Sequence, residues 1–248
     1  MTEPNYRIES AWPSHVETPA EIGRKFFLTL DALARIDPVF CDWGTVEDID
    51  SLIGHPMEPL RQDFTPYVES HVLRDDWGQP DPHQGYRLWA SSGHRPYPEL
   101  EPRSMTLSVT AGSTWENRLS LEAGYYTVPP DHAVVTYPIF KSALLILIEI
   151  WPAPWANVQV SLWGQKPPTL PGEPPFPYSG YQMPWISYLC AERAARITLP
   201  DEILTERTPD GGLLMIAAQT RLDPTRRDHM ARSRVLAEVM IKHGGDPR

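Results

Sequence analysis

The chain has 248 residues, of which 41% are hydrophobic and 22% are charged, and its formal net charge at pH 7 is −10. This length fits one large domain or two small ones, and the apolar fraction excludes a chain without a core. The first ten residues have no basic start and no apolar run, and no apolar run reaches the roughly 20 residues that a membrane-spanning helix needs, so we expect a cytoplasmic protein without a membrane partner.

The first third of the chain predicts a strand followed by a helix. Residues 5–12 alternate between apolar and polar side chains, as in a strand with one buried face. Thr18, Pro19 and Glu21 form a capping box with proline at the first helical position, which predicts a helix from Pro19 to about Arg35. This helix should end before Pro38, because the residue before a proline is disfavoured in helical conformation. Short helices are predicted at residues 46–53 and 59–64.

The middle of the chain predicts an antiparallel meander and then the most apolar segment. Residues 84–91, 105–111 and 117–123 each alternate, and the connections between them are too short for a crossover helix. Within residues 137–155, a helical spacing places several large apolar residues on one face, and Pro152 and Pro154 end the run. We interpret it as a helix buried on several sides; a central strand is the alternative.

The last third predicts four more strands and a final helix. The strands are residues 157–163, 185–190, 202–207 and 213–218. Residues 166–177 contain too many prolines for a helix or a central strand, so they predict an extended surface loop between two layers. Asp223 and Pro224 are expected to begin the last helix, and Gly244 and Gly245 to end it. The expected fold is α+β, with antiparallel strands packed against a few helices, in one domain of residues 1–248 or in two lobes, 1–135 and 136–248.

No pattern typical of a catalytic or metal site is present. The two cysteines and eight histidines have no zinc-type spacing, and there is neither a nucleophile elbow nor a glycine-rich phosphate loop. We therefore expect no cofactor, no metal and no enzymatic activity. The alternative is a small hydrolase with a site assembled in space, for example from His71 with Asp75 or from His94 with Glu99.

The negative charge is concentrated in one segment. Residues 42–81 contain ten acids and two bases, whereas residues from Arg221 onward contain seven bases and four acids. Such a segment repels nucleic acid and attracts a basic protein, although a solvated face that keeps the chain soluble is the alternative. Tryptophans beside acids are typical of a docking surface for a basic partner. The residues expected to contact the partner are Asp42, Trp43, Glu47, Asp48, Asp50, Asp75, Asp76, Trp77 and Asp81.

Motifs at both ends of the chain resemble a known family. The N-terminal motifs are the strand at residues 6–9, the helix with Phe27, Leu28, Leu30 and Leu33, and the exit at residues 36–38 with Phe40 and Trp43. The C-terminal motifs are residues 184–189, 211–214, 223–224 and 229–234. Together they resemble the immunity protein 52 family of bacterial polymorphic toxin systems, and residue 89 and residues 151–152 match more loosely. The chain departs from the family at residues 220–221, where the family tends to carry acidic and proline residues, and at residues 225–227, which replace a more acidic stretch.

The resemblance implies a cytoplasmic antidote without catalytic residues. Members of this family bind a cognate toxin, typically a restriction-endonuclease-like nuclease domain that a secretion system such as type VI delivers between bacteria. We therefore expect stoichiometric occlusion of a basic nuclease toxin, with the acidic residues and tryptophans named above as the first contacts. The identity of the toxin and the oligomeric state are left open.

Overall fold

A computed structural model describes residues 4–45, 55–92, 104–123, 130–162, 167, 169, 172, 175–177 and 182–244. Its strands are β1 (Asn5–Pro13), β2 (Gly44–Thr45), β3 (Tyr86–Ser91), β4 (Met105–Ala111), β5 (Glu116–Ala123), β6 (Trp155–Ser161), β7 (Gln182–Leu189), β8 (Leu204–Arg207) and β9 (Leu213–Ile216). Its α-helices are α1 (Pro19–Ala34), α2 (Thr65–Ser70), α3 (Tyr137–Ile150), α4 (Ala191–Ala194) and α5 (Arg227–Val239). Short 3₁₀ helices are η1 (Pro38–Phe40), η2 (Glu58–Gln62) and η3 (Pro82–Gln84), and a π-helical turn, η4 (Met240–Gly244), follows α5.

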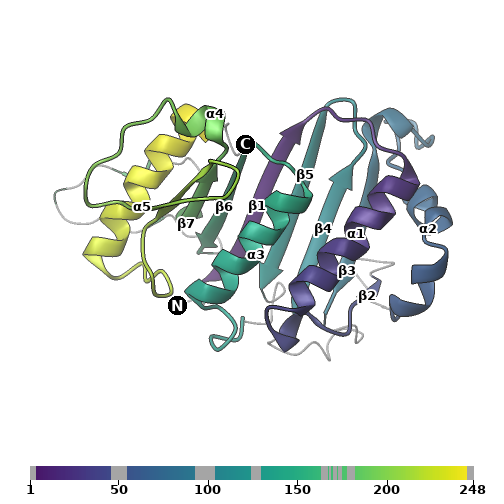
Figure 1. Ribbon diagram of the computed structural model, residues 1–248, viewed down its shortest axis with the longest axis horizontal. Coiled ribbons are helices and arrows are strands. Elements are labelled where there is room, and N and C mark those ends of the chain that lie inside the picture. The colour runs from purple at the N-terminus through teal and green to yellow at the C-terminus, as the bar shows by residue number, and fades with distance from the viewer. Residues whose placement is uncertain are drawn as a thin grey trace.

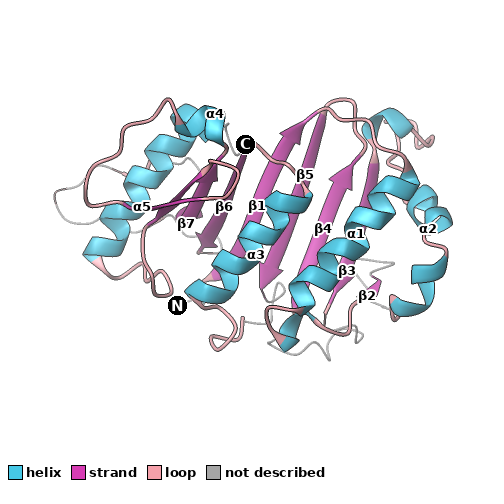
Figure 2. Ribbon diagram, in the orientation of Figure 1, coloured by secondary structure: helices cyan, strands magenta, loops and turns pink. Residues whose placement is uncertain are grey.

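The described strands form one sheet of nine, in the order β2-β3-β4-β5-β1-β6-β7-β9-β8, and every pairing between them is antiparallel. Helices α1 and α3 lie side by side across one face of this sheet, and α5 packs against β7 and β9 (Figures 1 and 2). The predicted α+β class is confirmed. Because β1 pairs with β5 on one side and β6 on the other, both halves of the chain share the same sheet and the same apolar core.

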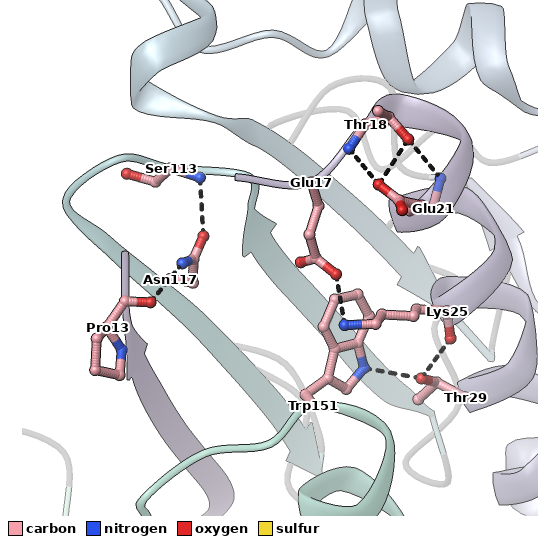
Figure 3. A network of polar contacts seen from close by, with 9 residues as sticks. All are labelled: Pro13, Glu17, Thr18, Glu21, Lys25, Thr29, Ser113, Asn117 and Trp151. Atoms are coloured by element: carbon pink, nitrogen blue, oxygen red, sulfur yellow. Dashed lines mark hydrogen bonds and ion pairs between the residues drawn. The ribbon is translucent and has the colours of Figure 1, made fainter. Parts of the chain in front are cut away.

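Helix α1 begins where the capping box predicts. The backbone N–H of Thr18 donates to Glu21 Oε2 at 2.8 Å, and the backbone N–H of Glu21 donates to Thr18 Oγ1 at 3.3 Å (Figure 3). These two bonds satisfy amide donors that a helix start otherwise leaves without a partner. The apolar face of the helix, with Ile22, Phe26 and Leu33, is fully buried.

Helix α3 is the apolar segment that the sequence singles out, and it is a helix rather than a strand. Its buried residues, including Phe140 and Leu144, follow one helical stripe. The Phe140 ring lies 6.4 Å from Tyr6 of β1 and 5.7 Å from Trp185 of β7, centroid to centroid. The other apolar residues of the helix, such as Ile146, are only partly buried. The expected burial on several sides is therefore met only in part, because one stripe is buried and the rest of the helix surface is partly exposed.

Alternation along β1 decides which side chains meet these helices. Tyr6, Ile8 and Trp12 point to the helical face and are buried, and the Trp12 ring lies 5.5 Å from that of Trp151. On the opposite face, Arg7 forms ion pairs with Glu9 and with Glu122 of β5 at 3.2 and 3.4 Å. One face of β1 is therefore core, and the other is polar and partly exposed.

Some predicted boundaries differ from the structure. Asp223 does not cap α5: its carboxylate accepts bonds from the backbone N–H and hydroxyl of Thr225, which closes a turn, and the helix starts at Arg227. The helix predicted at residues 59–64 is the 3₁₀ helix η2. The helix predicted at 46–53 and half of the residues of the loop predicted at 166–177 lie outside the described residues. Among the helices within the described ranges, none combines the length and apolar character that crossing a bilayer needs.

Candidate functional site

A tight hairpin at residues 74–80 holds three of the predicted contact residues. One carboxylate oxygen of Asp75 accepts bonds from the backbone N–H groups of Trp77 and Gln79, at 3.0 and 2.8 Å. Gly78 has a φ of +78°, a conformation that glycine adopts without steric cost. The Trp77 side chain is 83% exposed, and Asp76 is exposed beside it. The hairpin therefore presents a large aromatic ring and carboxylate charge to solvent from a hydrogen-bonded turn.

Asp81, another predicted contact, serves mainly local structure. It caps η3: one carboxylate oxygen accepts from the backbone N–H of His83 at 3.0 Å, and the other accepts from Gln84 Nε2 at 3.2 Å. Aspartate after proline commonly starts a turn in this way. Asp81 is half-buried, so it adds negative charge to this region without being a prominent contact.

Two further loops lie against this hairpin region at the same end of the sheet. Both the backbone N–H and the hydroxyl of Thr114, in the β4–β5 turn, donate to the His83 carbonyl at 2.9 and 3.0 Å. The backbone N–H of His15, in the β1–α1 loop, donates to the Ser113 carbonyl at 3.2 Å. Ser113 in turn donates its N–H to Asn117 Oδ1 at 2.9 Å (Figure 3). Hydrogen bonds thus connect the β1–α1 loop, the β4–β5 turn and η3, and η3 follows directly on the hairpin.

These loops carry exposed apolar side chains that the sequence interpretation did not include. Trp115 is 79% exposed and Val16 is 73% exposed. Within the described ranges the large exposed hydrophobic residues are Val16, Leu28, Trp77, Trp115, Leu204 and Ile241. Half of them lie at this one end of the sheet. We name the group Val16, Asp75, Asp76, Trp77 and Trp115 the tryptophan surface.

Trp115 was missed because it lies outside the acidic segment. The available signal was its position, since a large aromatic residue at the tip of a short turn between two strands has little to pack against. Val16 offered a similar signal, between the end of a strand and a helix N-cap. The exposure of Trp115 and Val16 could be expected from their positions between predicted elements, whereas composition does not indicate it.

Trp43 is not an exposed contact residue, and the prediction must be corrected. Its side chain is only 8% exposed and belongs to the apolar core, where its ring lies 6.5 Å from that of Phe40. Asp42 is exposed and has a φ of +54°, which is uncommon for a residue other than glycine. Glu47, Asp48 and Asp50 lie outside the described residues.

The acids that the sequence groups together lie at opposite ends of β3. Residues 44 and 45 pair with the last two residues of β3, whereas Val72, shortly before the hairpin, pairs with Tyr86 at its first residue. Five residue steps at about 3.3 Å each separate the two ends by roughly 17 Å. Asp42 therefore lies well apart from the hairpin acids, at the other end of β3.

The described residues do not support the hydrolase alternative at His71 and Asp75. His71 Nδ1 lies 2.7 Å from the Tyr67 carbonyl and 3.0 Å from Ser70 Oγ, and its ring packs on Tyr67 at 4.2 Å. Asp75 is held in its own turn, so neither residue is paired with the other. His94 and Glu99 lie outside the described residues. Across the described part of the chain, no group of three His, Cys, Asp or Glu residues could hold a metal ion.

A shallow groove of about 480 Å³ lies between α1 and the η2–α2 segment. Arg61 crosses it, with two guanidinium nitrogens 2.8 and 2.9 Å from the Asp31 carboxylate and its Cζ 4.5 Å from the centre of the Phe27 ring. The hydrogen bonds to Asp31 are the main cause that raises the pKa of Arg61. The residues that line this groove include no histidine, cysteine, serine or lysine.

A buried ion pair fastens the β1–α1 loop to the core. Glu17 Oε1 lies 2.5 Å from Lys25 Nζ, and their side chains are 4% and 18% exposed. Lys25 also lies over the Trp151 ring, 5.2 Å from its centre, and Trp151 Nε1 donates to Thr29 Oγ1 at 2.9 Å (Figure 3). The loop that carries Val16 is therefore held by both α1 and the end of α3.

Comparison with known proteins supports the fold. No family model matches this sequence, and no curated protein matches it. The solved structure of the T6SS protein PA0821 of Pseudomonas aeruginosa is similar to this chain, with a TM-score of 0.54 and 12% sequence identity. The similarity covers 97% of this chain and 73% of that chain. At this identity it shows that the two proteins share a fold.

Proposed function

We propose that this chain is an immunity protein of a type VI secretion system, which binds a cognate toxin and neutralises it. The observation that carries the proposal is the fold shared with a solved T6SS protein over 97% of this chain. The sequence motifs described above support it independently, since they resemble the immunity protein 52 family. The toxin is proposed to be a restriction-endonuclease-like nuclease, and the chain to act in the cytoplasm of the cell that it protects.

Inhibition is proposed to occur by stoichiometric occlusion. Nucleases that bind DNA carry basic surfaces, because phosphate neutralisation dominates their affinity. An acidic partner is steered towards such a surface and competes with the substrate for it. The net charge of −10 and the exposed carboxylate of Asp76 on the hairpin fit this role. Occlusion requires no catalytic group from the inhibitor.

The test is co-expression with the protein encoded by the adjacent open reading frame. We expect that protein alone to arrest growth of a bacterial host and co-expression of this chain to restore it. The purified pair should co-elute in gel filtration, and a 1:1 mixture should abolish DNA cleavage. A matched control is an unrelated acidic protein of similar size and charge. If growth is not restored and the purified pair does not co-elute, the immunity function is wrong.

A further inference from the structure

We propose that the toxin docks on the tryptophan surface, where Trp77 and Trp115 act as two anchors that enter apolar pockets on a cationic face of the toxin. This inference rests on the proposed function and specifies where the contact is made.

The exposure of the two indoles is the first argument. Single exposed apolar residues are normal on a protein surface, but tryptophan is strongly enriched among the residues that dominate binding energy. Here two tryptophans that are 83% and 79% exposed lie on neighbouring turns, with Val16 at 73% on the adjoining loop. Other exposed apolar residues in the described chain, such as Leu28 and Ile241, are aliphatic and lie on helices elsewhere.

The second argument is that this surface is already ordered without a partner. Besides the hydrogen bonds that link the three loops, Gly85 packs so closely that an added Cβ would lie 2.5 Å from the Ala111 carbonyl oxygen and 2.8 Å from the Ser113 nitrogen. The start of β3 is thereby fixed against the β4–β5 turn that carries Trp115. The Glu17–Lys25 ion pair holds the loop of Val16. Binding to an ordered surface loses less conformational entropy.

Charge identifies the kind of partner. Asp75 and Asp76 precede Trp77 directly and Asp81 follows the hairpin, so three acids outnumber the nearest base, Arg74, which keeps its positive charge while it donates to the Gly78 carbonyl at 2.7 Å. Beside Trp115, Glu116 is neutralised by Arg118 at 2.5 Å. The uncompensated charge around the tryptophans is therefore negative, which favours a cationic protein face and disfavours nucleic acid.

The surface around Asp42 is less suited to docking the toxin than the tryptophan surface. At the opposite end of β3, Asp42 is exposed, but the neighbouring indole of Trp43 is buried and offers no anchor. The end of the sheet with Trp77 combines exposed rings with negative charge.

The experiment measures binding of the adjacent-frame protein to four variants by isothermal titration calorimetry. Trp77→Ala and Trp115→Ala should each weaken Kd roughly 30-fold, the change expected for a residue that dominates an interface. Leu28→Ala and Ile241→Ala, which remove exposed apolar side chains elsewhere, should change Kd less than about 2-fold. All four positions are exposed, so thermal unfolding should match that of the parent chain.

A second measurement uses the unmodified protein. Acrylamide quenching of tryptophan fluorescence should fall when the complex forms, because Trp77 and Trp115 become shielded. To isolate the charge contribution, Asp76→Lys should slow association at low salt, whereas Asp201→Lys, at another exposed acid, should not.

The outcomes separate the two proposals. If the parent chain binds and both tryptophan variants bind equally well, the docking surface is wrong while the immunity function stands. A loss confined to Leu28→Ala would likewise place the interface elsewhere and overturn this inference. If the parent chain itself does not bind, the proposed function fails, and the docking surface fails with it.

Discussion

Replacing Lys25 with methionine should destabilise the protein severely. The substitution keeps most of the side-chain volume and removes the ammonium group that faces Glu17 at 2.5 Å. Glu17 would then be left as a carboxylate with a side chain only 4% exposed. Its Oε2 already has no hydrogen-bond partner among the described residues, so the pair with Lys25 is its main compensation.

The magnitude follows from the burial of both groups. Removing one partner of a buried ion pair costs about 3–5 kcal/mol, because the remaining charge is desolvated without compensation. For a chain of 248 residues, each kcal/mol corresponds to roughly 2–4 °C in melting temperature, so a decrease of roughly 6–20 °C is expected. A surface ion pair would give less than about 1 kcal/mol.

Urea denaturation followed by circular dichroism measures this loss. The double variant Lys25→Met with Glu17→Gln removes both charges and should recover most of the stability, which a double-mutant cycle quantifies. Lys242→Met, at an exposed lysine, is the matched control and should leave the midpoint unchanged. If Lys25→Met behaves like this control, the pair does not stabilise the β1–α1 loop in the way that we infer.

Two further predictions concern a pair of glycines and one carboxylate. Gly85→Ala should lower the free energy of unfolding by roughly 3 kcal/mol or more, and Gly78→Ala by only about 1 kcal/mol. Both glycines have a positive φ, but only a Cβ at Gly85 would meet backbone atoms. Equal urea midpoints for the two variants would contradict this. The hydrogen bond from Lys141 is the largest cause that lowers the pKa of Glu206 below its ordinary value of 4.5. The ionised carboxylate therefore stabilises the folded state above pH 4.5, and this stabilisation is lost as the pH falls through the folded-state pKa. The stability difference between the parent chain and Glu206→Gln should therefore be constant from pH 7 to about 5 and shrink below 4.5; a difference that persists to pH 3 would show that the pKa is not lowered.

Local chemistry explains which elements were predictable from sequence. Strand β4 has the predicted bounds because apolar and polar residues alternate along its whole length, and α1 starts as predicted because Thr18 and Glu21 signal its first turn. The two-residue β2 and the four-residue α4 have no periodicity to detect, since tertiary contacts determine them. Asp223 was assigned to the wrong element because an aspartate before proline is equally suited to a turn.

The candidate site was predictable only in part, for a reason of geometry. Composition located the acids of residues 42–81, but it could not reveal that β3 places Asp42 and Asp76 at opposite ends of a strand. It also could not separate Trp43, which packs in the core, from Trp77, which projects from a turn. Trp115 lies at the same end of the sheet as Trp77 because strands that are distant in sequence pair with each other, and the composition of one segment cannot show this.

The central position of β1 has a consequence for how the protein is made. Tyr6, near the start of the chain, pairs with Ala123 on one side and with Val160 on the other. Because β1 is synthesised well before either neighbour, it must wait for both of them, and contacts of such long sequence separation slow folding. The apolar face of β1 stays uncovered during this interval, so the partly folded chain is most prone to aggregation before both neighbouring strands have paired with it.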